Sequence, residues 1–213
     1  MIAEPDVTLT DWGLAVECAV LSRMIARDGG PRPHALARPW LALFFASTAV
    51  AALLGGMVHG LFPGTTAVGR LLWPTTILAI GVTAWAAWAA GGHLAFGPKV
   101  GRAIARLAGV GFVAYAVVAW RGGFAFAVAI AGYLPAAAFL LGVFAWRYRT
   151  SHDRRLLAGV AGIGLTFVAA AVQQARVSLS AAYFDYNALY HVIQAVALWL
   201  IYRGAARALA PPA

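Results

Sequence analysis

Two histidines, His59 and His191, stand inside strongly apolar stretches of the sequence. An ionisable side chain at membrane depth is costly, so it usually faces the interior of a helix bundle and marks a site. Two imidazoles with a carboxylate and an open position suit a divalent metal, zinc above all. A bound zinc ion turns water into a hydrolytic nucleophile near neutral pH. The two histidines therefore predict a polar site, with metal-dependent hydrolysis as its leading chemistry.

Glu17 is the expected third metal ligand. It lies about two turns into the first apolar stretch, whereas His59 and His191 each lie about one turn from an end of theirs. At 1.5 Å per residue, all three fall within roughly 10 Å of the same membrane boundary. Glu4 and Asp6, by contrast, are expected to be solvated loop charges.

Further polar residues cluster around His191. Asn187, His191 and Gln194 stand at i, i+4 and i+7, so they share one helix face. Asn187, Gln194 and Gln173 are expected to orient ligands or to steady a developing oxyanion. Asp185 is the expected general base, and Asp11 is assigned to the same polar pocket.

The composition identifies the elements that must position these residues. The chain is 62% hydrophobic and 11% charged, with a mean hydropathy of +0.79, which excludes a soluble domain. A membrane-spanning helix needs about 20 mostly apolar residues. The sequence predicts one all-α integral membrane domain over residues 1–213, a bundle of seven transmembrane helices. The expected spans are Thr10–Ala26, Pro39–Phe62, Gly69–Ala90, Ala103–Trp120, Phe124–Trp146, Arg155–Ala175 and Asn187–Arg207.

The distribution of basic residues predicts the orientation of the bundle. With the N-terminus outside and the C-terminus in the cytoplasm, 13 of the 16 basic residues fall on the cytoplasmic side. This asymmetry follows the positive-inside rule for short loops. It also accounts for the net charge of +9 without nucleic acid, whose binding would require a basic, aromatic-rich soluble surface. We therefore expect membrane lipids, and no nucleic acid, as partners.

Two short motifs resemble a known group of proteins. They are the Gly-Gly-x-x-His-Gly run ending at Gly60 and the Asn-x-x-Tyr-His-x-x-Gln run ending at Gln194. At these runs the chain resembles a family of small bacterial seven-helix membrane proteins of unassigned function. That family is similar to the superfamily of alkaline ceramidases and progestin/adiponectin receptors. The resemblance implies a place in the bacterial inner membrane and zinc-dependent hydrolysis of a lipid amide or ester.

The match to the superfamily motif is incomplete. In the superfamily, zinc is held by a histidine on helix two and by two histidines spaced by four on helix seven. His59 and His191 match one histidine of each set, but Asn187 and Ala195 stand where the second helix-seven histidine would be. Gly55 replaces a serine of the motif, and the third stretch has no aspartate. Glu17 or Asp185 is the expected substitute ligand.

Other functions remain open from the sequence. A non-enzymatic binding or sensor protein would use the same pocket for a lipid or another small ligand. A partner subunit of a larger membrane complex would use the histidines only as polar contacts between helices. Haem ligation by the two histidines is a weaker alternative. A retinal pigment is disfavoured because the only lysine, Lys99, lies at the cytoplasmic boundary.

Overall fold

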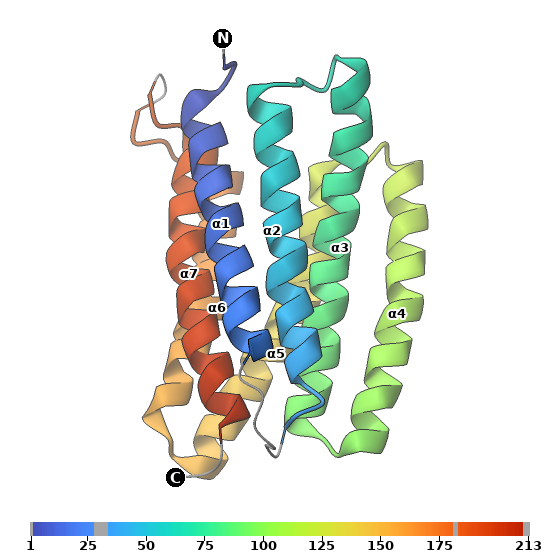
Figure 1. The fold of residues 1–213 in the computed structure, drawn as a ribbon, viewed down its shortest axis with the longest axis vertical. Helices are drawn as coiled ribbons and strands as arrows, with labels where there is room; N and C mark the ends of the chain where they lie inside the picture. Colours follow the sequence, from blue (N-terminus) through green and yellow to red (C-terminus); the bar gives the residue numbers. More distant parts are fainter. Residues whose placement is uncertain (1, 28–33, 181–182, 211–213) are drawn as a thin grey trace.

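The apolar stretches fold into long helices that run side by side along the molecule (Figure 1). In the computed structural model, which describes residues 2–27, 34–180 and 183–210, seven α-helices are present, as the sequence predicts. Arg32, which the orientation argument counts, lies outside the described residues. The helices are α1 (Pro5–Arg27), α2 (Arg38–Gly60), α3 (Ala67–Ala95), α4 (Pro98–Arg121), α5 (Phe126–Ser151), α6 (Leu157–Gln174) and α7 (Tyr186–Leu209).

The helices begin and end where the local sequence requires it. The Thr66 hydroxyl accepts a hydrogen bond from the Gly69 amide and so caps the start of α3. Helix α4 begins with Pro98, whose missing N–H costs nothing in the first turn. Between α4 and α5 the chain turns through Gly123, whose φ of +62° favours glycine. The N-terminus lies at one end of the bundle and the C-terminus at the other (Figure 1).

Six of the described helices form a closed ring. Around it, α1 contacts α2, α2 contacts α3, α3 contacts α5, α5 contacts α6, α6 contacts α7, and α7 returns to α1. Helix α4 lies outside the ring and packs mainly on α3 (Figure 1). The hydrophobic core fills the half of the ring nearer the C-terminal end, where Phe44, Phe45 and Phe144 are fully buried.

Helices α6 and α7 approach so closely that only glycine fits between them. A Cβ at Gly162 would come within 2.6 Å of the Ala197 carbonyl oxygen. A Cβ at Gly204 would come within 2.5 Å of the Gly159 Cα. Small residues at such contacts are typical of helix packing in membranes, where backbones approach closely.

The helices have the length and composition of membrane spans. Within the described residues, six helices are long and apolar enough to cross a membrane: α2, α3, α4, α5, α6 with the short 3-10 turn before it (Arg154–Leu156), and α7. The sequence predicts seven such spans. Helix α1 is not among the six, and it carries the carboxylates of Asp6, Asp11 and Glu17.

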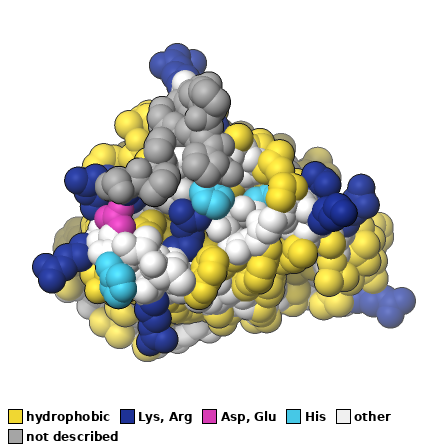
Figure 2. Space-filling model, turned by 90° about the horizontal axis from the view of Figure 1, so that it is seen from below, with side chains coloured by type: hydrophobic (Ala, Val, Ile, Leu, Met, Phe, Trp, Pro, Cys, Tyr) yellow, Lys and Arg dark blue, Asp and Glu magenta, His cyan; other side chains and the backbone are white. Residues whose placement is uncertain are grey.

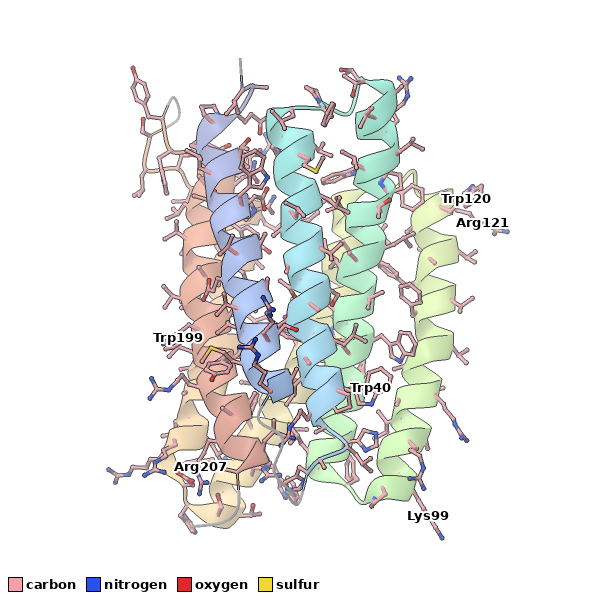
Figure 3. The ribbon with its side chains drawn as sticks, viewed as in Figure 1. Trp40, Lys99, Trp120, Arg121, Trp199 and Arg207 are labelled. Atoms are coloured by element: carbon pink, nitrogen blue, oxygen red, sulfur yellow. The ribbon has the colours of Figure 1, made fainter. Side chains whose placement is uncertain are left out.

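The exterior of the bundle is also apolar. Trp120 on α4 and Trp199 on α7 point outward (Figure 3) and are 78% and 43% exposed. Large apolar side chains on an outer surface suit contact with lipid. The fold is that of a membrane helix bundle.

Candidate functional site

The ring of helices encloses a cavity of about 320 Å³ towards the N-terminal end of the bundle. All six ring helices contribute side chains to its wall. On α7 the wall extends from Tyr186 to Leu198, a rise of about 18 Å, so the cavity runs deep into the bundle. Six of the eight predicted site residues line it: Asp11, His59, Gln173, Asn187, His191 and Gln194.

Asp11 and His191 form a buried pair on the cavity wall. Nε2 of His191 lies 3.2 Å from Oδ1 of Asp11, and only 4% of Asp11 is exposed. A Cβ at Gly55 would lie 3.3 Å from Oδ2 of Asp11, so the glycine of α2 leaves room for this carboxyl group. The glycine that replaces the motif serine thus has a structural role of its own.

Thr10 holds the His191 ring in place from the other side. Its hydroxyl donates to the backbone carbonyls of α1, with Oγ1 at 2.9 Å from the Asp6 oxygen and 3.0 Å from the Val7 oxygen. Oγ1 therefore accepts from Nδ1 of His191, which lies 3.2 Å away. Nδ1 of His191 is thus the nitrogen directed at Thr10, and Nε2 is the nitrogen that faces Asp11.

His59 lies at the outer part of the cavity and bonds a different carboxylate. Its Nδ1 is 2.7 Å from Oε2 of Glu4. Asp6 likewise has a partner, because its Oδ2 accepts from the Asp185 amide at 3.0 Å. The prediction of a solvated loop charge is wrong for Asp6, which lies in α1, whereas Glu4 precedes α1 and its side chain is 51% exposed. Both residues tie the N-terminal segment to the rest of the bundle.

Amide side chains complete the polar wall. Nε2 of Gln173 donates to Oδ1 of Asn187 at 3.4 Å, which joins α6 to α7. Nε2 of Gln194 donates to the Thr166 hydroxyl at 3.4 Å, also between α6 and α7. Oε1 of Gln194 is buried without a hydrogen-bond partner among the described residues. It is an acceptor that lacks a donor, in a residue that lines the cavity.

Two predicted site residues lie elsewhere. Glu17 does not line the cavity, because it stands about 120° around α1 from Asp11. Asp185 is the N-cap of α7: Oδ1 accepts from the amides of Asn187 and Ala188 at 2.8 and 2.9 Å. Its carboxylate is occupied by the helix terminus and does not line the cavity. The structure does not place Glu17 or Asp185 where a ligand or a general base would act.

The zinc ion that the resemblance implies does not fit the side chains as they are arranged. Both ring nitrogens of His191 have partners, and Nδ1 of His59 bonds Glu4. Throughout the part of the chain that the structure describes, no three His, Cys, Asp or Glu side chains converge as a metal site. A zinc ligand set built from His59, His191 and Glu17 would require these contacts to be exchanged.

Aromatic residues of the cavity were not anticipated from the sequence. Tyr133 and Phe126 of α5, Trp73 of α3 and Tyr190 of α7 all line it. Tyr133 is the first residue with a polar side-chain atom in a helix made mostly of Ala, Val, Leu and Gly, and Tyr190 precedes Gln194 by four residues. The positions of Tyr133 and Tyr190 were the signals in the sequence from which these two cavity residues could have been predicted.

The fold and the site define a class: a seven-helix membrane-type bundle with a partly polar cavity inside a six-helix ring. Comparison with known families places the chain more narrowly. It belongs to the family described as "Family of unknown function (DUF6962)", which matches residues 7–210. No curated protein and no solved structure matches the chain significantly.

Proposed function

We propose that this protein binds a small amphiphilic molecule whose cationic or hydrogen-bond-donating head lies against Asp11 and Gln194. One observation carries the proposal: a buried carboxyl group and an acceptor without a donor line the same cavity. A buried acceptor left unsatisfied costs about 1–3 kcal/mol. A donor on the ligand would recover that free energy.

The charge of the cavity supports a cationic or donor head over an anionic one. No Lys or Arg is among the described residues that line it, and Asp11 is. Trp73, Tyr133 and Tyr190 add ring faces, which attract cations through their quadrupoles. An anionic head would meet the Asp11 carboxyl group, with no Lys or Arg side chain among the described lining residues to offset it.

The apolar lining supports an alkyl or ring portion on the ligand. Leu14, Ala52, Ile80, Ile130 and Leu134 surround the deeper part of the cavity. At about 320 Å³, the cavity lies at the lower end of the range of about 300–1,000 Å³ typical of small-molecule sites. A lipid fragment or a small membrane-soluble amine would fill it.

The setting of the cavity supports access from the outer side of a membrane. With the orientation that the positive-inside rule favours, the N-terminal end of the bundle faces outside. In a bacterial inner membrane, the ligand would enter from the outer leaflet or from the space beyond it. The protein would act as a binding or sensor protein of that membrane.

A pair of photoreactive probes tests the proposal. Decylamine and decanoic acid, each carrying a diazirine on the chain, are added to the protein in lipid nanodiscs, and labelled peptides are identified by mass spectrometry. We expect the amine to label α5 and α7 peptides and the acid to label them weakly. In Asp11→Asn, amine labelling should fall about tenfold, because a hydrogen bond to a charged group contributes about 1.5–3 kcal/mol.

Glu17→Gln is the matched control. It removes a carboxylate from the same helix but outside the cavity, so amine labelling should stay at the wild-type level. Equal labelling by the amine and the acid, or an equal loss in both variants, would contradict the proposal.

Hydrolysis of a lipid amide or ester with zinc, the activity that the resemblance implies, is the second candidate. It is favoured by one observation, that His59, His191 and Asp11 line a single cavity. It requires His59 to release Glu4 and His191 to release one of its two partners. Metal content separates this candidate from simple binding.

A further inference from the structure

A second cavity, of about 410 Å³, lies at the C-terminal end of the bundle. Its walls come from the ends of α3 and α5, the start of α4, and the segment before α2. Figure 2 looks onto this end of the molecule. It shows Lys and Arg side chains around the outer edge of this end, with little acidic surface in view. No Asp or Glu is among the described residues that line the cavity.

His93 faces this cavity without a partner. The residue is only 7% exposed, and its side chain lines the wall and makes no hydrogen bond to any described residue. Its ring is held against α4, since a Cβ at Gly101 would come within 2.4 Å of Nδ1. An imidazole on the wall of a cavity, with no side-chain hydrogen-bond partner among the described residues, is available to a ligand there.

Arg147 brings a fixed positive charge to the same wall. Its Nη1 donates to Nε2 of His34 at 2.7 Å and to the Leu94 carbonyl at 3.0 Å. Its Nη2 donates to the Ala208 carbonyl at 3.2 Å. These bonds fix the guanidinium between the ends of α3 and α7, where a cation is favoured. No described carboxylate pairs with it, so the positive charge remains available to a ligand.

The N-terminus of α4 lies at the same wall. Gly97 and Pro98 line the cavity. Pro98 has no N–H, so the first free amides of α4 are those of Lys99 and Val100, and Gly97, the N-cap, has no side chain to accept from them. The first amides of a helix have no acceptor within it, and together with the helix dipole they attract anions. Arg102, one turn further along α4, acts electrostatically on His93. Every charge and every free donor named at this site favours a negative ligand.

We propose that the cavity at the C-terminal end binds a phosphate group, held by His93, Arg147 and the first turn of α4. The phosphate belongs either to a lipid headgroup or to a small soluble molecule. This site is separate from the cavity of Asp11 and His191 and does not depend on the function proposed for that cavity.

Inorganic phosphate tests the proposal directly. Lipid-depleted protein in detergent is titrated with sodium phosphate against sodium chloride at equal ionic strength, and thermal unfolding is followed by tryptophan fluorescence. We expect a saturable rise in Tm that chloride does not reproduce. In His93→Leu the apparent Kd should rise about tenfold, since a ligand hydrogen bond to a charged group is lost. The His93 side chain bonds no described residue, and the substitution leaves the backbone in place, so this variant is expected to fold.

His152→Asn is the matched control, because His152 lies at the same end but outside the cavity, and asparagine tolerates its φ of 55°. Its phosphate response should equal that of the wild type. A parallel series uses nanodiscs of phosphatidylcholine with or without phosphatidic acid. Stabilisation by phosphatidic acid alone assigns the site to a lipid headgroup, and stabilisation by free phosphate assigns it to a soluble ligand. If neither stabilises the protein, or if His93→Leu responds like the wild type, the proposal is wrong.

Discussion

Nε2 of His191 lies 3.2 Å from Oδ1 of Asp11, although 180 positions separate the two residues in the chain. The contact joins α7 to α1 and closes the ring of six helices at the point where the cavity begins. The same pair therefore both holds the ring together and supplies the polar part of the cavity wall.

The Asp11–His191 pair predicts a measurable coupling. Asp11→Leu and His191→Leu should each lower stability by about 1–3 kcal/mol, because each leaves the other side chain buried without its partner. The double variant should cost less than the sum, with a coupling of about 0.5–3 kcal/mol. Thermal unfolding in detergent measures all four proteins. Strict additivity would show that the contact does not hold α1 to α7.

Metal content separates binding from zinc-dependent hydrolysis. Since the described His, Cys, Asp and Glu side chains do not converge on one point, we expect far less than one zinc per chain in protein purified without chelators. Elemental mass spectrometry measures this, with His59→Ala/His191→Ala for comparison. About one zinc per chain, lost in the double variant, would favour the hydrolase instead.

Two glycines of α6 should respond oppositely to alanine. Gly162→Ala places a methyl group 2.6 Å from the Ala197 carbonyl oxygen, so α6 and α7 must separate. The expected cost is about 1–3 kcal/mol, as for an overpacked core. Gly164 has nothing within 4 Å of a built Cβ, so Gly164→Ala should stabilise by up to about 1 kcal/mol through helix propensity. Equal changes in Tm would contradict the close contact between α6 and α7.

His34 predicts an acid-sensitive stability. Burial, and then the charge of Arg147, lowers its pKa below the ordinary 6.5, against a smaller opposing effect of the His93 backbone. Below pH 6.5 the His34 side chain therefore binds a proton more readily in the unfolded chain than in the folded chain. The stability that neutral His34 contributes is complete above pH 6.5 and is lost progressively as the pH falls towards the folded pKa.

The comparison of His34→Gln with wild type measures that contribution. Glutamine still offers an acceptor to Arg147 but does not titrate. The fall in Tm between about pH 7.5 and pH 5.5, in buffers free of phosphate, should be smaller in His34→Gln, because the group that takes up a proton on unfolding is gone. His152→Asn should show the full wild-type fall. An equal fall in Tm in His34→Gln and His152→Asn would show that His34 is not the source of the acid sensitivity.

The sequence predicts the seven helices because each is a long apolar stretch bounded by Pro, Gly or charge. The shared face of Asn187, His191 and Gln194 is also correct, because helix periodicity alone places them together. Other signals were present but missed. Six of the eight buried residues of α1 follow each other at alternating steps of four and three: Val7, Asp11, Leu14, Cys18, Leu21 and Ile25. That stripe includes Asp11 and excludes Glu17.

The remaining features depend on how distant helices meet. Contacts between helices place α4 outside the ring. Because α4 is outside, α3 and α5 contact each other and both contribute to the cavity wall. Helices α4 and α5 are similar in length and in their richness in small and apolar residues, so composition does not separate them. The role of Asp185 was readable as an N-cap, since an aspartate directly before a helix usually caps it.

The central claim is that the cavity of Asp11 and His191 holds a small amphiphile, and the most direct test is to identify what the purified protein carries. Wild type, Glu17→Gln, Asp11→Leu and the cavity-filling Ala52→Trp are extracted with organic solvent, and the bound molecules are quantified by mass spectrometry. We predict one compound with an amine or hydroxyl head, near one per chain in wild type and Glu17→Gln and depleted in the other two. Extracts that do not differ among the four proteins would contradict the account.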